Sequence, residues 1–210
     1  MSTTHDFEST RRRLSPQQAE TVASLTEAAI IVLRNTGYSK LTVRLVAAEA
    51  GVAPATAYTY FSSKNHLVSE LFWRRLVELP EDPGAGRTQA ERVSAVMRDV
   101  ALLVSDEPAM AAAVTAALLG DDPEVRHLRI RIGLDIRRRL ASALDPGGRT
   151  DTSTGGAETT TGEPGAHADP DVLEALEVIW SGGLVRAGMG HQTYAEIADR
   201  LETFARLILE

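Results

Sequence analysis

Hydroxyl-bearing and small side chains are concentrated in one short stretch, residues 54–60 (PATAYTY), and a lysine follows at position 64. Hydroxyl groups can bond phosphates or base edges, and small apolar groups can contact the thymine methyl. Because residues 54–60 contain no Lys or Arg, we expect readout of DNA shape and phosphates rather than bidentate contacts with guanine. The side chains that this chemistry offers to DNA are Pro54, Ala55, Thr56, Tyr58, Thr59, Tyr60 and Lys64.

Two short helices joined by a turn must position these side chains. Thr42 precedes apolar residues spaced three and four positions apart, as on one face of a helix, so it is the expected N-cap of the first helix. Gly51 supplies the turn, and Pro54 opens the second helix, which runs to Phe61. This arrangement is typical of a helix-turn-helix, whose first helix crosses the phosphate backbone while the second lies in the major groove. An ordinary corner between packed helices is the alternative for the helix pair alone.

Apolar spacing predicts longer helices on both sides, and no stretch alternates as a strand would. We expect an all-α fold of about nine helices, with connectors at the Pro- and Gly-rich junctions. Residues 145–170 contain six Gly and no Val, Ile, Leu, Met or aromatic residue, so we interpret them as a mobile loop. The expected long helices span residues 16–36, 64–79, 88–105, 108–119, 122–144, 171–189 and 193–209.

Residues 41–67 (LTVRLVAAEAGVAPATAYTYFSSKNHL) resemble the DNA-binding domain of the tetracycline-repressor (TetR) family. The shared pattern is a Thr-initiated helix, AGV, a short helix ending in Tyr-x-Tyr-Phe, then Ser-Lys and Leu. Ala53 stands where the family usually has a Ser cap, and Pro54 and Ala55 stand where Lys or Ser and Gly are frequent. These departures leave the operator sequence open. The resemblance implies DNA contacts from Thr42, Arg44, Thr56, Tyr58, Tyr60 and Lys64, and structural roles for Gly37, Ala47, Gly51, Val52 and Phe61.

The resemblance also implies an N-terminal helix-turn-helix domain, an Ω-like homodimer and a C-terminal domain whose ligand releases DNA. We therefore expect a flexible arm over residues 1–14, a DNA-binding domain over 15–79, and a ligand-binding and dimerisation domain over 80–210. Arg11, Arg12 and Arg13 in the arm are either a solvated flank or a contact to phosphate or the minor groove. In the expected mechanism, an effector makes the helix of residues 64–79 swing and changes the separation of the two recognition helices.

Apolar stripes in residues 80–210 suggest both an effector site and a dimer surface. Ordinary core packing is the alternative for each residue of the effector set, and Gly182 with Gly183 indicates a close helix approach or a kink. The candidates for effector binding are Met97, Ala101, Met110, Val114, Leu118 and Trp180. The candidates for the dimer interface are Val172, Leu176, Ile179, Leu184, Tyr194, Ile197, Leu201, Phe204 and Ile208.

Charge and composition narrow the function classes. The net charge is -7, but residues 1–79 carry +2 and residues 80–210 carry -9, so only the first part favours a polyanion. Cys is absent, no nucleophile elbow or phosphate loop is present, and we expect no cofactor, no metal site and no catalytic residue. Asp121, Asp122, Glu124 and His127 are interpreted as ordinary acidic helix-start residues with a neighbouring His. The run Arg137–Arg139 is a solvated helix face or a site for an acidic ligand group.

The sequence thus predicts a cytoplasmic transcriptional repressor that binds a palindromic operator on double-stranded DNA as a homodimer and is released by a small apolar effector. No run of residues is apolar enough for a membrane span or a signal peptide. The alternatives are an all-α interaction protein without sequence-specific DNA binding, and an enzyme acting on a small molecule. The effector, the operator and the regulated genes stay open, as does activation in place of repression.

Overall fold

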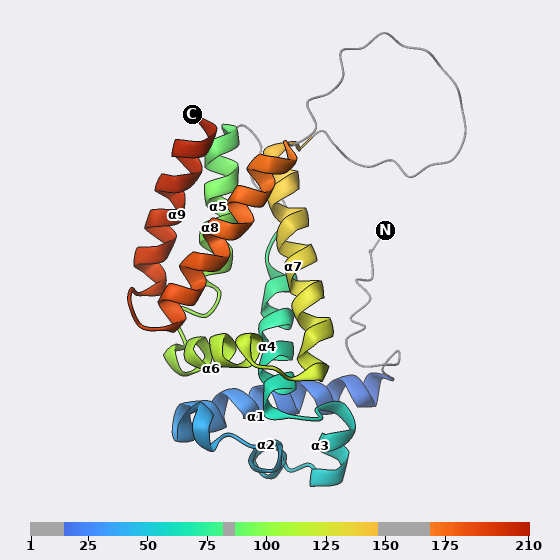
Figure 1. Cartoon of the computed structure of the whole chain (residues 1–210). Helices are drawn as coiled ribbons and strands as arrows, with labels where there is room; N and C mark the ends of the chain where they lie inside the picture. Colours follow the sequence, from blue (N-terminus) through green and yellow to red (C-terminus); the bar gives the residue numbers. More distant parts are fainter. Residues whose placement is uncertain (1–14, 82–86, 147–168) are drawn as a thin grey trace, which may run out of the picture. The chain divides into compact units, whose positions relative to one another are not determined.

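A computed structural model describes residues 15–81, 87–146 and 169–210, and these residues form nine helices and no strand (Figure 1). The predicted all-α fold is confirmed. The predicted arm over residues 1–14 and most of the predicted loop over 145–170 lie outside the described residues. The helices are α1 (Pro16–Lys40), α2 (Val43–Glu49), α3 (Pro54–Tyr60), α4 (Lys64–Glu78), α5 (Gln89–Leu102), α6 (Pro108–Leu119), α7 (Pro123–Leu144), α8 (Pro170–Gly188) and α9 (Tyr194–Leu209).

Side-chain caps explain why several helices begin where they do. Ser15, Thr88 and Thr193 each accept a hydrogen bond from a backbone N–H three residues later. At each of these caps the Gln or Glu side chain three residues later accepts a hydrogen bond from the backbone N–H of the cap residue, which completes a capping box. Such caps are local signals, so they mark these helix starts in the sequence.

Gly37 interrupts the first helix at the point where the predicted helix, residues 16–36, ends. Its φ of 73° and ψ of 167° lie outside the helical region, and one further helical turn follows as far as Lys40. A residue with a Cβ is strained at that φ, so the position favours Gly. Regular helix therefore ends near Thr36, and the turn at residues 38–40 leads directly into Thr42.

The chain packs as two compact units. The first unit comprises residues up to Val77 together with Asp106–Ile132, and the second comprises Glu78–Ser105 with Gly133–Glu210. In the first unit α1 packs against α2 and α6, and α2 packs against α3. The helix-turn-helix therefore shares its core with α6 and the start of α7. The predicted boundary near residue 79 separates a DNA-binding domain from a ligand-binding and dimerisation domain by function, and it stays a prediction.

Two ion pairs hold the segment before α6 against α1 and α4 in the first unit. Arg34 on α1 binds both carboxylate oxygens of Glu107, with 2.9 Å between Nε and Oε2. This ion pair keeps the pKa of Glu107 below its ordinary value, mainly through the hydrogen bond from Arg34. Arg75 on α4 lies 3.5 Å from the neighbouring Asp106. The segment that leads into α6 is thus held by two basic residues from the N-terminal helices.

The second unit is built on α9, which packs against α5 and α8. Gly183 is the point of close approach between α8 and α9, because a Cβ there would lie 3.0 Å from Cγ2 of Ile197. A Cβ at Gly182 would meet nothing within 4 Å. The predicted close approach is therefore found at Gly183 alone, and α8 continues as helix through both glycines.

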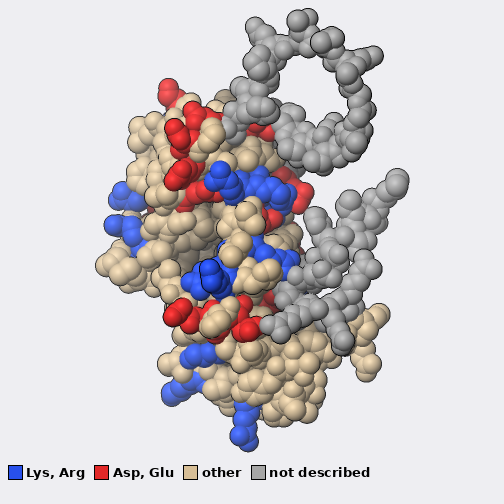
Figure 2. Space-filling model, turned by 45° about the vertical axis from the view of Figure 1, so that its right-hand side comes forward, with Lys and Arg blue, Asp and Glu red and all other residues tan. Residues whose placement is uncertain are grey.

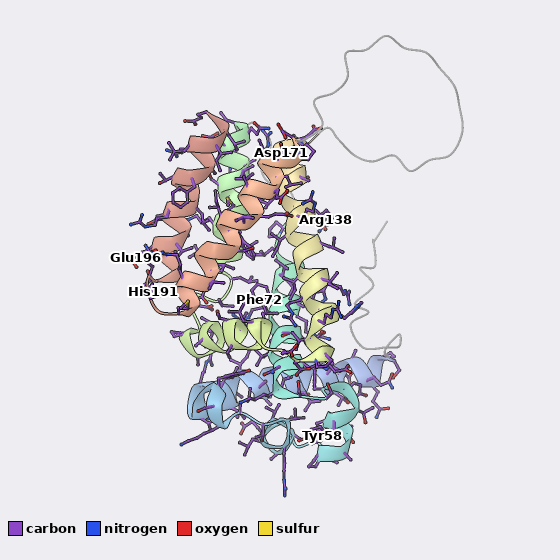
Figure 3. The ribbon with its side chains drawn as sticks, in the orientation of Figure 1. Tyr58, Phe72, Arg138, Asp171, His191 and Glu196 are labelled. Carbon is purple, nitrogen blue, oxygen red and sulfur yellow. The ribbon has the colours of Figure 1, made fainter. Side chains whose placement is uncertain are left out.

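The Arg137–Arg139 run is not a simple solvated face. Arg139 is 5% exposed; it donates to Asp135 over 2.7 Å and to the carbonyl oxygens of Leu79 and Pro80. Arg138, labelled in Figure 3, binds Asp135 and Glu81, and Arg137 binds Glu177. The interpretation of Arg139 as solvated is wrong, because the pattern of charges along α7 does not reveal backbone carbonyls brought in by the residues after α4.

No helix within the described ranges has both the length and the apolar character that crossing a bilayer requires.

Candidate nucleic-acid interface

The turn between α2 and α3 has the geometry of a helix-turn-helix. Gly51 has a φ of 66°, and the backbone N–H of Val52 donates to the carbonyl of Ala47 over 2.9 Å. Thr42 caps α2 by accepting from the N–H of Leu45 over 3.1 Å, without the acidic partner of a capping box. Ala53 precedes α3 and offers no side-chain cap. The first N–H groups of α3 are thus left for solvent or a ligand.

Helix α3 has a buried side and an exposed side. Ala57 and Phe61 are fully buried, whereas Tyr58, labelled on α3 in Figure 3, is 50% exposed. Thr59 donates to the carbonyl of Ala55 over 3.1 Å, so its hydroxyl oxygen remains as an acceptor. Tyr60 is half-buried. The exposed members of the predicted DNA-contacting set are Thr42, Arg44, Pro54, Ala55, Thr56, Tyr58 and Thr59.

Lys64 has a structural role beside its predicted contact with phosphate. Its ammonium donates to the carbonyl of Tyr38 over 3.0 Å and to that of Ser39 over 3.4 Å, and lies 4.3 Å from the centre of the Tyr38 ring. Tyr38 in turn donates to the side chain of Asn65, and burial raises the pKa of its phenol. Lys64 therefore joins the end of α1 to the start of α4.

The start of α4 is fixed by Ser63, one of two serines that could cap it. Its hydroxyl accepts from the N–H of His66 over 3.0 Å and donates to Asp122 over 2.6 Å. Asp122 also accepts from the N–H of Glu124, which places it at the start of α7 as the sequence indicates. His66 lies edge-on to Phe61, and burial holds the pKa of its imidazole below the ordinary value.

Exposed cations lie near α2 and α3, together with one exposed acid, Glu49, at the end of α2. On the face drawn in Figure 2, the end of the molecule that contains α2 and α3 carries Lys and Arg side chains and no Asp or Glu. Arg44 is exposed on α2, and Lys40 is exposed two residues before Thr42. Lys40 was not among the sequence candidates. The signal that could have found it is its place at the entry to α2, the helix expected to cross the phosphate backbone.

The predicted effector residues are mostly buried inside their own units. Met110 and Val114 are buried and Leu118 is half-buried in the first unit. Met97 and Ala101 are buried in the second unit, as is Trp180. The indole N–H of Trp180 has no partner among the described residues. This orphan donor sets Trp180 apart from the purely apolar members of the set.

The predicted dimer residues divide into two groups. Leu176, Ile197 and Leu201 are 0%, 2% and 1% exposed within the chain, so they belong to the core of the second unit and do not form its surface. Apolar periodicity alone does not separate a core face from a surface face, which is why these three were included. Val172, Ile179, Leu184, Tyr194 and Ile208 are half-buried and Phe204 is exposed. Val178 and Leu207, at 64% and 75% exposure, are apolar surface residues that the sequence analysis missed.

Comparisons with known proteins agree on one family. Residues 25–71 match the model of the tetR family of bacterial regulatory proteins. An uncharacterised HTH-type transcriptional regulator of Mycobacterium tuberculosis (strain H37Rv) is 46% identical over 195 residues, which cover 92% of this chain and 82% of the relative. The HTH-type transcriptional repressor KstR of Rhodococcus jostii (strain RHA1) is 26% identical over 198 residues, 93% of this chain and 85% of the relative.

Solved structures agree on the fold. A TetR transcriptional regulator from Rhodococcus sp. RHA1 superimposes with a TM-score of 0.67 at 20% identity, covering 89% of this chain and 96% of that one. The transcriptional regulator FadR of Bacillus subtilis, solved in complex with stearoyl-CoA, gives a TM-score of 0.59 at 19% identity over 90% of this chain and 97% of that one. The family match and the curated relatives, rather than these structures, favour the DNA-binding regulator over the interaction protein and the enzyme.

Proposed function

The chain belongs to the tetR family of bacterial regulatory proteins, and from that premise we propose that it is a repressor whose homodimer binds a palindromic operator until an effector is bound. The observation that carries the proposal is the α3 surface. Tyr58 is half-exposed there beside exposed hydroxyl-bearing and small side chains, while Ala57 and Phe61 anchor the helix from within. Helix α3 is the recognition helix of this proposal.

Contacts on α2 and α4 would orient α3 in the major groove. Arg44 and Lys40 are exposed cations at the expected position of the phosphate backbone. The ammonium of Lys64 uses protons for two backbone carbonyls, and an ammonium has three donors, so one proton can meet a phosphate. Because α3 carries no Lys or Arg, most affinity should come from phosphate contacts and most specificity from shape and hydroxyl contacts.

The experiment that tests DNA binding is footprinting of the full-length protein on fragmented genomic DNA of its source organism, at two salt concentrations. Recovery of a palindrome whose half-sites lie about 34 Å apart, with binding that weakens steeply in salt, supports the proposal. Recovery of no specific fragment, with the protein folded and free of bound ligand, contradicts it.

A homodimer is needed to seat two recognition helices on two half-sites. The surface that supports it is the apolar face of α8 and α9, where Val178, Phe204 and Leu207 are exposed and Val185 is half-buried. Large apolar side chains that are exposed in one chain gain free energy when a partner buries them. We propose that this face pairs with its copy in a four-helix bundle.

A small, largely apolar effector is proposed to release the operator. Met97, Ala101, Met110, Val114, Leu118 and Trp180 stay our candidates for contacting it, and the unpartnered indole N–H of Trp180 supports its place in that set. FadR of Bacillus subtilis was solved with stearoyl-CoA, which makes long-chain acyl thioesters the first class to test here. The effector would act by binding the operator-free state more tightly, with a typical coupling of about 1 to 3 kcal/mol.

KstR, a relative named as a repressor, supports repression rather than activation. A reporter gene placed behind the recovered operator decides between the two modes. Repression predicts high expression in cells that lack the protein and low expression in cells that contain it; the reverse pattern contradicts the proposal. Because the operator lies on the chromosome, we place this activity in the cytoplasm.

A further inference from the structure

Four buried polar side-chain atoms have no hydrogen-bond partner among the described residues: Ser69 Oγ, Trp73 Nε1, Ser94 Oγ and Trp180 Nε1. Buried polar atoms in native proteins are nearly always hydrogen-bonded, so each exception calls for a ligand or a water. Ser69 and Trp73 are distinct among the four because they lie on the same helix, α4, and both belong to the first unit. Figure 3 labels their neighbour Phe72 on α4.

Ser69 and Trp73 are placed to act together. Residues four apart on a helix are neighbours on one face, with Cβ atoms about 5 to 6 Å apart. Long side chains on a helix generally point back toward its N-terminus, so a Trp at position 73 is suited to reach over the turn that carries Ser69. All seven residues from Leu67 to Trp73 are buried, which keeps both donors away from bulk water.

The hydroxyl of Ser69 differs from the threonine hydroxyls of other helices, which bond to backbone carbonyls. Among the described residues, five helical threonines donate to the carbonyl four residues earlier, for example Thr36 to Val32 over 2.8 Å and Thr115 to Ala111 over 3.4 Å. The same bond was open to Ser69 through the carbonyl of Asn65, and it is not made. The hydroxyl is therefore unused by its own helix.

The chemistry of the pair defines what it can bind. An indole N–H is only a donor, and a serine hydroxyl can donate, so the two together suit one oxygen acceptor. The neighbouring Glu70 is 2% exposed, and its carboxylate binds Arg74 at 3.1 Å. The guanidinium of Arg131 stacks 4.6 Å from the Trp73 ring. An uncharged oxygen is less costly to bury than a charged one, so we take an uncharged oxygen as the acceptor.

We propose that Ser69 and Trp73 form a polar subsite on α4 that binds the uncharged carbonyl oxygen of an otherwise apolar effector. The inference rests on the proposed function, because it assumes that an effector is bound. It goes further by requiring a carbonyl, such as that of a thioester, where α4 meets the ligand. The ligand oxygen would accept from the two donors that have no partner among the described residues.

The test compares stearoyl-CoA with S-octadecyl-CoA, a thioether that lacks only the carbonyl oxygen. Binding to the full-length protein is measured by titration, and operator release by gel shift. We expect the wild type to bind stearoyl-CoA about tenfold more tightly than the thioether, the range of one lost hydrogen bond. Ser69→Ala and Trp73→Phe should each reduce that preference to about threefold or less.

Ligand-free stability separates an unused hydroxyl from a structural one. Ser69→Ala should leave the Tm unchanged or raise it, because no hydrogen bond is lost. The matched control is Thr26→Val, which removes a buried hydroxyl that donates to Ala23 over 2.8 Å; it should lower the Tm and keep the preference for stearoyl-CoA. A Tm loss in Ser69→Ala equal to that of the control would overturn the proposal.

The outcomes distinguish failure of the subsite from failure of the function. Equal binding of the two probes by the wild type, or an unchanged preference in both variants, overturns the subsite while operator release still supports the proposed effector class. If stearoyl-CoA neither binds the wild type nor releases the operator, the acyl-thioester class and the subsite built on it both fail, and footprinting of the ligand-free protein still tests DNA binding.

Discussion

Among the side chains of the helix-turn-helix, residue type predicts which ones on α3 face outward but not the second role of Lys64. The alternation of small, hydroxyl-bearing and aromatic residues on α3 predicts which side chains face outward, because a seven-residue helix has room for one buried face. The second role of Lys64 was hidden, since its carbonyl partners come from residues 38 and 39, and only the fold brings them together. Long-range partners of this kind leave no periodic signal.

Tyr58→Ala should weaken operator binding about 10- to 100-fold, the range expected for loss of a specific base or phosphate contact. The side chain is 50% exposed, so the fold loses little by its removal. Electrophoretic mobility shift and thermal unfolding check the two parts. The matched control is Leu119→Ala, which shortens a 61% exposed side chain on α6, outside the helix-turn-helix, and should bind operator as the wild type does. Wild-type affinity in Tyr58→Ala would show that α3 is not the recognition helix.

The Arg34–Glu107 pair should make stability depend on pH. The pKa of Glu107 is below its ordinary value of about 4.3 in the folded protein, so its stabilisation is fully present above that value and is lost as pH falls through the folded pKa. Arg34→Met should therefore lower the urea midpoint at pH 7 but change it much less near pH 3. Arg44→Met, at an exposed position on α2, is the control and should leave both midpoints unchanged. A constant difference at both pH values would contradict the ion-pair explanation.

At the scale of the elements, caps determine where helices start, and glycines determine where the chain turns and where helices approach closely. Caps such as Thr42, Thr88 and Thr193 predict helix starts because their bonds are local. Gly37 and Gly51 could be interpreted from sequence because each must adopt a positive φ at a turn. The roles of Gly182 and Gly183 could not be separated, since both lie inside one helix and only the position of α9 decides which of them is crowded.

Gly183→Ala should destabilise the second unit, because the new Cβ would lie 3.0 Å from the Ile197 side chain, which is 2% exposed and β-branched. Overpacking of this kind typically costs about 1 to 3 kcal/mol, which exceeds the gain in helix propensity of about 1 kcal/mol. Urea unfolding measures the difference. The control is Gly133→Ala in α7, where a Cβ meets nothing within 4 Å and should raise stability. Equal stabilisation by both changes would mean that α8 and α9 are not in close contact.

At the scale of the whole molecule, the sequence predicted the helical class, the DNA-binding motif and the uneven charge, all of which depend on composition or short patterns. In residues 80–210 the sequence did not distinguish core residues from surface residues. Leu176, Ile197 and Leu201 were assigned to a dimer surface although the chain buries them in its own core. Apolar residues that extend beyond one face of a helix, as Val178 on α8 and Leu207 on α9 do, give no local sign of which residues stay inside and which meet a partner.

Leu207→Asp should convert the dimer to a monomer, because a charge would replace a 75% exposed side chain at the proposed α8–α9 interface. Sedimentation velocity gives the oligomeric state, and operator binding should fall together with dimerisation. Leu134→Asp is the control: it introduces the same charge at a 61% exposed leucine of α7 and should remain dimeric. A dimeric Leu207→Asp variant would place the interface elsewhere.

The two tryptophans of the chain divide evenly between its compact units, Trp73 in the first and Trp180 in the second. Both are 8% exposed, so each indole should emit at short wavelength in the folded protein and shift to the red when its own unit unfolds. Replacing either one by Phe leaves a single fluorophore. The protein therefore contains a separate optical reporter for each unit, and comparison of the two single-tryptophan variants during denaturation would reveal whether the two compact units melt as one cooperative body or in sequence.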